Sequence, residues 1–282
     1  MRPLPPRRLA PVLAALALLA AAAAPAAQTD LDQFMSRVLE RRDENWKKMQ
    51  QYTLEEREVL QLTGPADVPI YGFVRDYTWY LRDGIFVRSP LRANGAEVAE
   101  DERRRYEDDW IRRERRRRRD EPRFVSAAYF LRFRFDPGQY ALVGRETLAG
   151  REVLRIEYYP TKLFTEGRAR PSRRVRERDD EVEEKMNKAS LVTLWIDPAI
   201  HQILKYDFDN LDMDFLPGRA LVRMGEIDAV MEMGQPFPGV WLPASIRIRV
   251  GMLSAAGAAA GRYDITYHDY RLADVKSRIR VP

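Results

Sequence analysis

Residues 244–270 read ASIRIRVGMLSAAGAAAGRYDITYHDY. Arginines alternate with Ile246 and Ile248, and a run of small residues follows before polar and apolar side chains alternate again. A period of two is typical of a strand with one buried face, and small residues at its end allow a turn. The stretch therefore predicts two antiparallel strands, Ala244–Leu253 and Arg262–Tyr270.

The same pattern recurs along the chain, with turns at dipeptides such as Asp83-Gly84 and Asp197-Pro198. Turns every eight to twelve residues favour an antiparallel sheet or barrel over βαβ units, and the segments add up to about 10–11 strands. We find no sequence repeat and no linker, so a mainly β single domain with helices is expected. The other predicted strands are Tyr52–Leu62, Tyr71–Leu81, Ile85–Arg88, Tyr140–Thr147, Val153–Tyr159, Leu191–Ile196, Ile200–Phe208, Arg219–Ile227 and Ala229–Met233.

Helical segments interrupt the strand pattern. Asp30–Met49 carries apolar residues at three- and four-residue steps, with Asp30 as its N-cap. Residues 97–119 begin with acids and end with arginines, which suits the dipole of a charged helix. Further helical pieces are predicted at 123–131 and 175–186, so charged insertions occupy residues 97–131 and 167–188.

The first 27 residues have the layout of a secretory signal. Arg2, Arg7 and Arg8 precede the apolar stretch Leu9–Ala24, and small residues lead to Ala27. The apolar stretch is shorter than the roughly 20 residues that a spanning helix needs. We expect cleavage after Ala27, which leaves a soluble periplasmic domain of residues 28–282.

Charge and cysteine content exclude several classes of function. Without the three leader arginines, 45 basic residues face 43 acidic ones, so a nucleic-acid partner is not expected. The sequence has no cysteine, which excludes disulfides, thiol catalysis, thiolate metal sites and a lipidated N-terminal cysteine.

No pattern of catalytic residues stands out. His201 and His268 are the only histidines, and neither accompanies a nucleophile elbow or a zinc-binding helix. Glu146 and Glu152 flank a turn, but pairs of acids are common in a chain with 43 of them. We therefore expect no enzyme activity and no cofactor.

Two charged segments admit a binding role as well as a plain structural one. One acidic segment resembles an oxygen-rich calcium loop but lacks its glycine and closing glutamate, so a solvated strand end without metal is favoured. Its acids are Asp207, Asp209, Asp212 and Asp214. The run Arg112–Arg119 could bind anionic head groups through guanidinium forks, whereas a solvated helix paired with nearby acids is the simpler interpretation.

Large apolar side chains recur at every second position of several predicted strands. Such faces form the core of a sheet packed on helices, or line a cavity if the sheet curls. The tyrosine- and tryptophan-rich face of Tyr71–Leu81 is interrupted by Arg75. The candidate ligand-binding residues are Phe73, Tyr77, Trp79, Met231, Met233, Ile248 and Val250.

These features together resemble the outer-membrane lipoprotein-sorting family, the LolA/LolB-like periplasmic carriers and related sensors. The resemblance is carried by the leader and by the following segments: Leu31–Met49 with Tyr52-Thr53-Leu54, Gly144–Leu154, Leu194–Pro198 with Gln202–Tyr206, and Tyr267–Arg271. It implies an unclosed antiparallel half-barrel whose helices cover the concave face above an apolar cavity for acyl chains. The seven candidate residues would share that face.

Three functions follow from this reading. The first is a periplasmic carrier that binds acyl chains of lipids or lipoproteins, with outer-membrane sorting as its role. The second is a cell-envelope sensor or interaction module, with other envelope proteins as partners. An exported hydrolase ranks last because no nucleophile and base can be named.

Overall fold

The computed structural model describes residues 30–116, 130, 135–160, 190–210, 222–254 and 257–273. It contains two long helices, α2 (Asp30–Met49) and α3 (Glu100–Arg116), and a single-turn helix at Pro65–Asp67. The strands are β1 (Tyr52–Thr63), β2 (Pro69–Arg82), β3 (Ile85–Ala93), β4 (Ala96–Glu97), β5 (Tyr140–Leu148), β6 (Arg151–Tyr158), β7 (Ser190–Asp197), β8 (Gln202–Asn210), β9 (Val222–Phe237), β10 (Val240–Ser254) and β11 (Gly257–Leu272).

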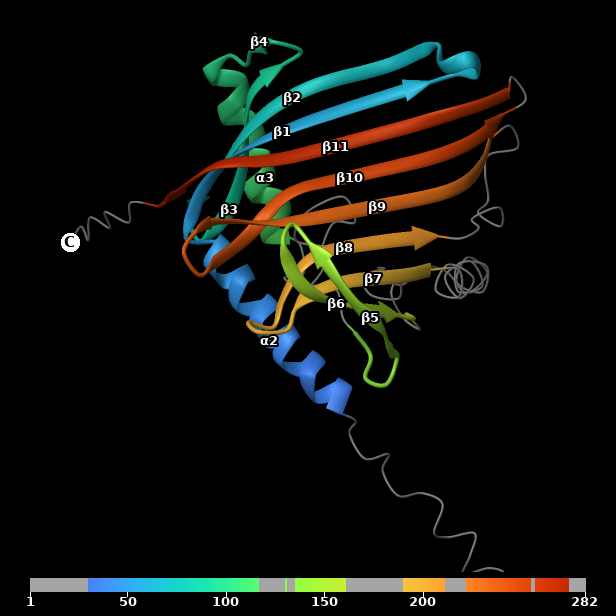
Figure 1. The fold of residues 1–282 in the computed structure, drawn as a ribbon. Helices are drawn as coiled ribbons and strands as arrows, with labels where there is room; N and C mark the ends of the chain where they lie inside the picture. The colour runs from blue at the N-terminus through green and yellow to red at the C-terminus, as the bar shows by residue number, and fades with distance from the viewer. Residues whose placement is uncertain are drawn as a thin grey trace, which may run out of the picture.

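All of these strands belong to one antiparallel sheet of 11 strands (Figure 1). Its order is β4-β3-β2-β1-β11-β10-β9-β8-β7-β6-β5, so the first and the last long strands pair near its middle. The sheet is unclosed, with β5 at one edge and the short β4 beside β3 at the other. This confirms the predicted mainly β, unclosed antiparallel architecture.

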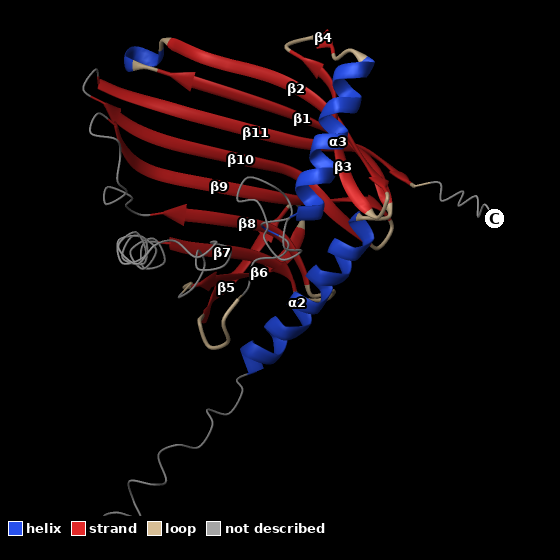
Figure 2. Ribbon diagram, turned by 180° about the vertical axis from the view of Figure 1, so that it is seen from behind, coloured by secondary structure: helices blue, strands red, loops and turns tan. Residues whose placement is uncertain are grey.

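Helix α2 defines one face of the sheet, which we call the inner face. The helix contacts β5, β8 and β10, which lie far apart in the strand order, so the sheet curls around it. Met35, Val38 and Met49 are buried on its apolar side. Figure 2 shows that the helices lie over one end of the long strands β1, β2, β10 and β11, which extend well past them.

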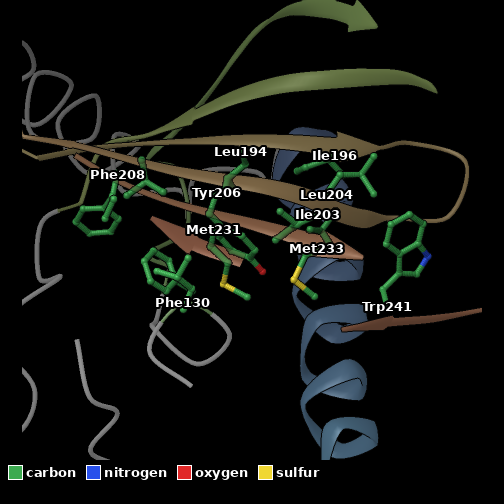
Figure 3. Close-up of a cluster of buried hydrophobic side chains, with 14 of the residues drawn as sticks. Phe130, Leu194, Ile196, Ile203, Leu204, Tyr206, Phe208, Met231, Met233 and Trp241 are labelled. Atoms are coloured by element: carbon green, nitrogen blue, oxygen red, sulfur yellow. The ribbon is translucent and has the colours of Figure 1, made fainter. Parts of the chain in front are cut away.

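The main hydrophobic core lies between α2 and the inner face. Met231 and Ala229 of β9 face Tyr206 and Phe208 of β8 across the ladder, and all four side chains are buried. Figure 3 shows Met231, Tyr206 and Phe208 together with Ile203 of β8 and with Leu194 and Ile196 of the neighbouring β7. Period-two alternation therefore places the core on the face that α2 covers.

A second, smaller cluster holds α3 against β3. It consists of Val87, Trp110 and Ile111, and the indole Nε1 of Trp110 donates a hydrogen bond to the carbonyl of Phe86 across 3.1 Å. Val87 alternates along β3 with Arg88, which reaches toward the inner face of β1. β3 therefore contacts α3 with one set of side chains and β1 with the other.

The structure corrects several predicted strand boundaries; β3 and β11, for example, are longer than predicted. The predicted strands Arg219–Ile227 and Ala229–Met233 are one strand, β9, because Asp228 is a half-buried strand residue paired with Asp209 and does not form a turn. β10 also begins earlier than predicted and continues through Pro243, which lies at a register shift opposite β9. Proline is tolerated there because a bulge does not need its missing N–H. The predicted helix 175–186 and all of 123–131 except residue 130 lie outside the described residues.

Candidate ligand-binding face

The strand ladders bring the seven predicted binding residues to the inner face. Phe73 of β2 pairs with Leu60 of β1, which pairs with Tyr263 of β11, which in turn pairs with Ile248 of β10. Paired residues in antiparallel strands point to the same side. The other candidates, Tyr77, Trp79, Met231, Met233 and Val250, follow on the same side by alternation along these strands and β9.

Burial divides the seven residues into two groups. Tyr77, Met231, Met233 and Ile248 are between 0% and 8% exposed, so they belong to the packed interior. Figure 3 shows Met231 beside Tyr206 and Phe130. Phe73, Trp79 and Val250 are half-buried. Phe73 and Val250 are therefore partly open to solvent, whereas the first group is covered.

Phe73 and Val250 of this group are part of a larger apolar surface, which we call the open strip, whereas Trp79 stacks on Phe86 and contacts Trp110. The open strip lies on the inner face toward the far ends of the long strands, beyond the helices. Its side chains converge closely: a Cβ atom added at Gly261 would lie 3.2 Å from Leu62 and 3.8 Å from Val250. The open strip consists of Leu60, Leu62, Tyr71, Phe73, Val250, Met252 and Tyr263, all half-buried except the exposed Tyr71.

A buried cluster of charges adjoins the open strip, and the sequence reading did not identify it. Glu56 and Glu58 of β1 are only 2% and 5% exposed. The guanidinium of Arg88 hydrogen-bonds Glu56 Oε1 and lies 3.2 Å from Glu58 Oε2. Trp79 Nε1 donates to Glu56 across 2.6 Å, and the hydroxyl of Tyr263 donates to Glu58. Two buried carboxylates are thereby held by one cation and two neutral donors.

This environment shifts the ionisation of the groups in it. Burial raises the pKa of Glu56 above its usual value, because it disfavours the charged form, and the pairing with Arg88 only partly opposes this. Burial likewise raises the pKa of Tyr77 to about 12, although the Arg88 guanidinium lies 3.4 Å from its ring centroid. Burial also raises the pKa of Tyr263, so the hydroxyls of Tyr77 and Tyr263 both remain protonated at neutral pH.

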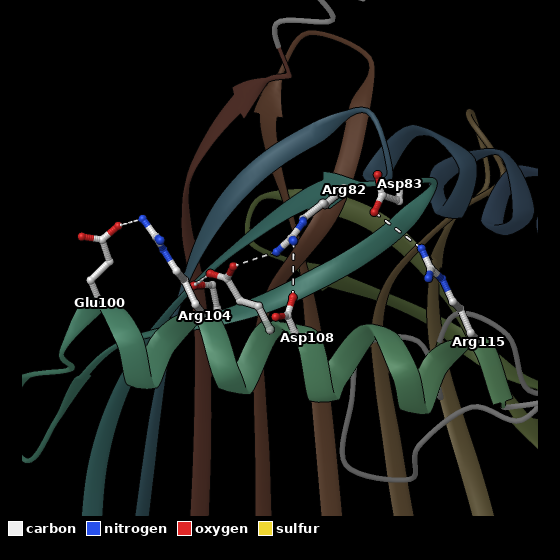
Figure 4. Close-up of polar contacts among 8 residues, drawn as sticks. Arg82, Asp83, Glu100, Arg104, Asp108 and Arg115 are labelled. Carbon is white, nitrogen blue, oxygen red and sulfur yellow. Dashed lines mark hydrogen bonds and ion pairs between the residues drawn. The ribbon is translucent and has the colours of Figure 1, made fainter.

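The arginine-rich helix forms ion pairs with nearby acids, including Arg112 and Arg115 of the predicted run. Arg104 pairs with Glu100 within α3, and Arg82 of β2 bridges to Glu107 and Asp108 (Figure 4). Arg115 pairs with Asp83, 3.5 Å away. Arg105 and Arg112 pair with Asp101 and Asp109 in the same helix. Residues 117–119 of the run lie outside the described residues.

The two glutamates considered for catalysis are engaged by other side chains. Glu146 accepts a bond from Trp195 Nε1 across 2.9 Å, and Glu152 pairs with Arg145. Asp209 faces Asp228 across the ladder, and burial together with neighbouring acids raises the pKa of both. Asp212 and Asp214 lie outside the described residues.

The two histidines occupy different places. The ring of His201 packs 5.2 Å from that of Phe34 on α2. His268 lies on the outer face near Glu55 and Asp269, with the three ligand atoms within 4.8 Å of one another. One imidazole and two carboxylates suit a divalent metal. Arg271 competes for the Glu55 carboxylate, however, from a distance of 3.4 Å.

No protein-family model matches the sequence, and no curated protein matches it. Within the described residues, no helix is both long and apolar enough to cross a bilayer.

Three solved structures are similar to this chain. A DUF1329 family protein from Desulfovibrio piger is 12% identical with a TM-score of 0.30, over 85% of this chain and 91% of the other. MucB in complex with MucA(peri) is 10% identical with a TM-score of 0.21, over 85% and 94%. LprF from Mycobacterium bovis is 8% identical with a TM-score of 0.25, over 85% and 97%. These values do not assign the chain to a family, and the description of the fold therefore rests on the strand register above.

Proposed function

We propose that this chain is an exported periplasmic protein that binds the apolar chain of an amphipathic ligand on the inner face of its half-barrel, as a carrier of acyl chains does. The observation that carries the proposal is the open strip. Seven apolar side chains gather on one face, and none of them is fully buried. Contiguous apolar surface of this kind on a soluble protein commonly marks an interaction site.

The shape of the sheet supports a chain-like ligand. The open strip crosses β2, β1, β11 and β10, and a strand spacing of about 4.8 Å makes it about 14 Å wide. A flexible thioether, Met252, lies at one end of it, and such side chains adapt to apolar ligands of varied shape. The packed core that includes Met231 fixes the curvature beneath α2, so the strip does not depend on a ligand for its form.

Export rests on the leader sequence. N-terminal sequencing of protein from the periplasmic fraction is expected to begin close to Gln28. An intact Met1 in the membrane fraction would contradict export as a cleaved protein.

Ligand binding is tested by lipid extraction. Protein purified from the periplasm without detergent is expected to release acyl-containing species, identified by mass spectrometry, at close to one per chain. Protein refolded from denaturant is the matched control, because it has been stripped of lipid. Equal and negligible lipid in both samples would contradict a carrier role.

An interaction module is the second candidate, and one observation favours it. β5 pairs with β6 on one side and, among the described residues, has no strand on its other side. Leu142 and Val143 on this edge strand are 54% and 47% exposed. An exposed apolar edge strand can pair with an extended segment of another protein.

A further inference from the structure

We propose that Arg75 binds the head group of the ligand, so that the inner face selects an amphiphile with an anionic carboxylate or phosphate head. This inference rests on the proposed function and specifies its ligand. It follows from a contrast between two arginines that share the inner face.

Arg88 is not free to bind an anion. Its guanidinium contacts the carboxylates of Glu56 and Glu58 and stacks on the ring of Tyr77. Its side chain is 14% exposed, and two buried acids already exceed its charge. An added anion would have to displace one of these carboxylates and leave it buried without a partner, which is unfavourable.

Arg75, unlike Arg88, lies at the surface and is available to bind an anion. It is exposed, and it forms no ion pair with any carboxylate among the described residues. Its direct partner across the ladder is Glu58, but Glu58 accepts a hydrogen bond from Tyr263 and lies in ion-pair contact with Arg88. The buried cluster thus occupies the acid that would otherwise neutralise Arg75.

The position of Arg75 suits a head-group anchor. Its guanidinium carbon lies 4.1 Å from the ring centroid of Phe73, a member of the open strip. Stacking on the ring orients the planar guanidinium while its N–H donors remain available. Among the inner-face residues of β1, β2, β10 and β11, Arg75 is the one cation.

Charge complementarity therefore specifies the occupant. A guanidinium fork binds carboxylates and phosphates through two parallel hydrogen bonds, and the adjoining apolar strip accepts a chain attached to such a head. A fatty acid and a phospholipid share this chemistry. An ammonium head group would instead meet the positive charge of Arg75, because both nearby carboxylates are engaged.

The test measures displacement of a neutral fluorescent probe by ligands with the same twelve-carbon chain, all below their micelle concentrations. The ligands are dodecanoate, dodecyl phosphate, dodecanol and dodecyltrimethylammonium, with inorganic phosphate as the head group alone. The variants are Arg75→Gln and, as matched control, Arg57→Gln. Arg57 lies on the neighbouring strand and points to the outer face, so the two changes remove the same charge from opposite faces.

Arg75→Gln is expected to weaken dodecanoate or dodecyl phosphate about tenfold and to leave dodecanol unchanged, whereas Arg57→Gln leaves all of them unchanged. The anion that loses more affinity identifies the head group as carboxylate or phosphate. Arg75→Lys retains the charge without the fork and should give an intermediate loss, which provides a second variant if Arg75→Gln is poorly folded.

The experiment distinguishes failure of the head-group assignment from failure of the proposed function. If the parent protein binds dodecanol and dodecanoate but Arg75→Gln changes neither, the head-group assignment is wrong and the proposed function stands. If no twelve-carbon ligand binds the parent, the proposed function itself is wrong. Binding of inorganic phosphate as tight as that of dodecyl phosphate would show that the open strip takes no part, and would overturn the assignment of an amphiphile.

Discussion

Asn45 on α2 donates a hydrogen bond to the side-chain oxygen of Gln202 on β8 across 2.7 Å, and both residues are at most 2% exposed. Gln202 in turn donates to the carbonyl of Ile203. This buried polar contact joins α2 to β8 and helps to fix where α2 sits on the inner face.

Removing one partner of this pair should destabilise the protein. Asn45→Ala leaves the Gln202 oxygen buried without a donor, which costs about 1–3 kcal/mol. Urea unfolding of Asn45→Ala, Gln202→Ala and the double variant measures the coupling. The double variant is expected to be less destabilised than the sum of the single ones; strict additivity would mean that the hydrogen bond does not contribute.

Substitution of Arg88 in the buried cluster should lower the free energy of unfolding more than substitution of Asn45 does. Arg88→Met preserves much of the side-chain volume but leaves Glu56 and Glu58 buried without their cation, which should cost about 3–5 kcal/mol of unfolding free energy at neutral pH. Arg57→Met on the exposed outer face is the control and should cost less than about 1 kcal/mol. Equal, small effects of both changes would show that the cluster is open to water.

The raised pKa of Glu56 should make the stability of the protein depend on pH. Its pKa is raised in the folded protein, chiefly by burial, from a usual value of 4.5. The folded state therefore holds the proton more tightly than the unfolded state, so stability decreases as the pH rises from 4.5 through the folded pKa and is level above it. Urea unfolding across this range should show a shallower decrease for Glu56→Gln, whereas Glu55→Gln on the opposite face should behave as the parent does. Parallel curves for all three proteins would contradict the assignment.

Substitution of Met231 by a charged residue should destabilise the fold. Its side chain is fully buried beside Tyr206, so Met231→Asp places a carboxylate in the core and should cost more than about 3 kcal/mol. A melting temperature equal to that of the parent would show instead that Met231 is accessible to solvent or ligand.

The sequence predicted the faces of the sheet better than it predicted which part of a face is covered. Alternation placed Phe73 and Val250 on the same side as Met231, and the ladders agree. Burial differs among them because it depends on where α2 crosses the strands, and this is set by contacts distant in sequence, such as Asn45 with Gln202.

The charged cluster was hidden for a related reason. Glu56 and Glu58 alternate with Arg57, which is typical of a solvated strand. Their burial is compensated by Arg88 of β3, two strands away in the sheet. No local sequence pattern predicts a contact between strands so far apart in the sequence. Arg75 was visible as an interruption of an aromatic face, but its lack of an acid partner follows only from the orientation of Glu58.

Binding of an apolar chain to the open strip is measured by fluorescence titration of a neutral apolar probe into two valine variants. Val250 lies in the strip, whereas Val74 is a half-buried valine on the outer face, paired with Val59. Val250→Asp should weaken probe binding about tenfold, because it places a charge where the chain lies, and Val74→Asp should bind the probe as the parent does. Equal probe affinity for the folded Val250→Asp variant and the parent would show that the open strip does not bind the apolar chain.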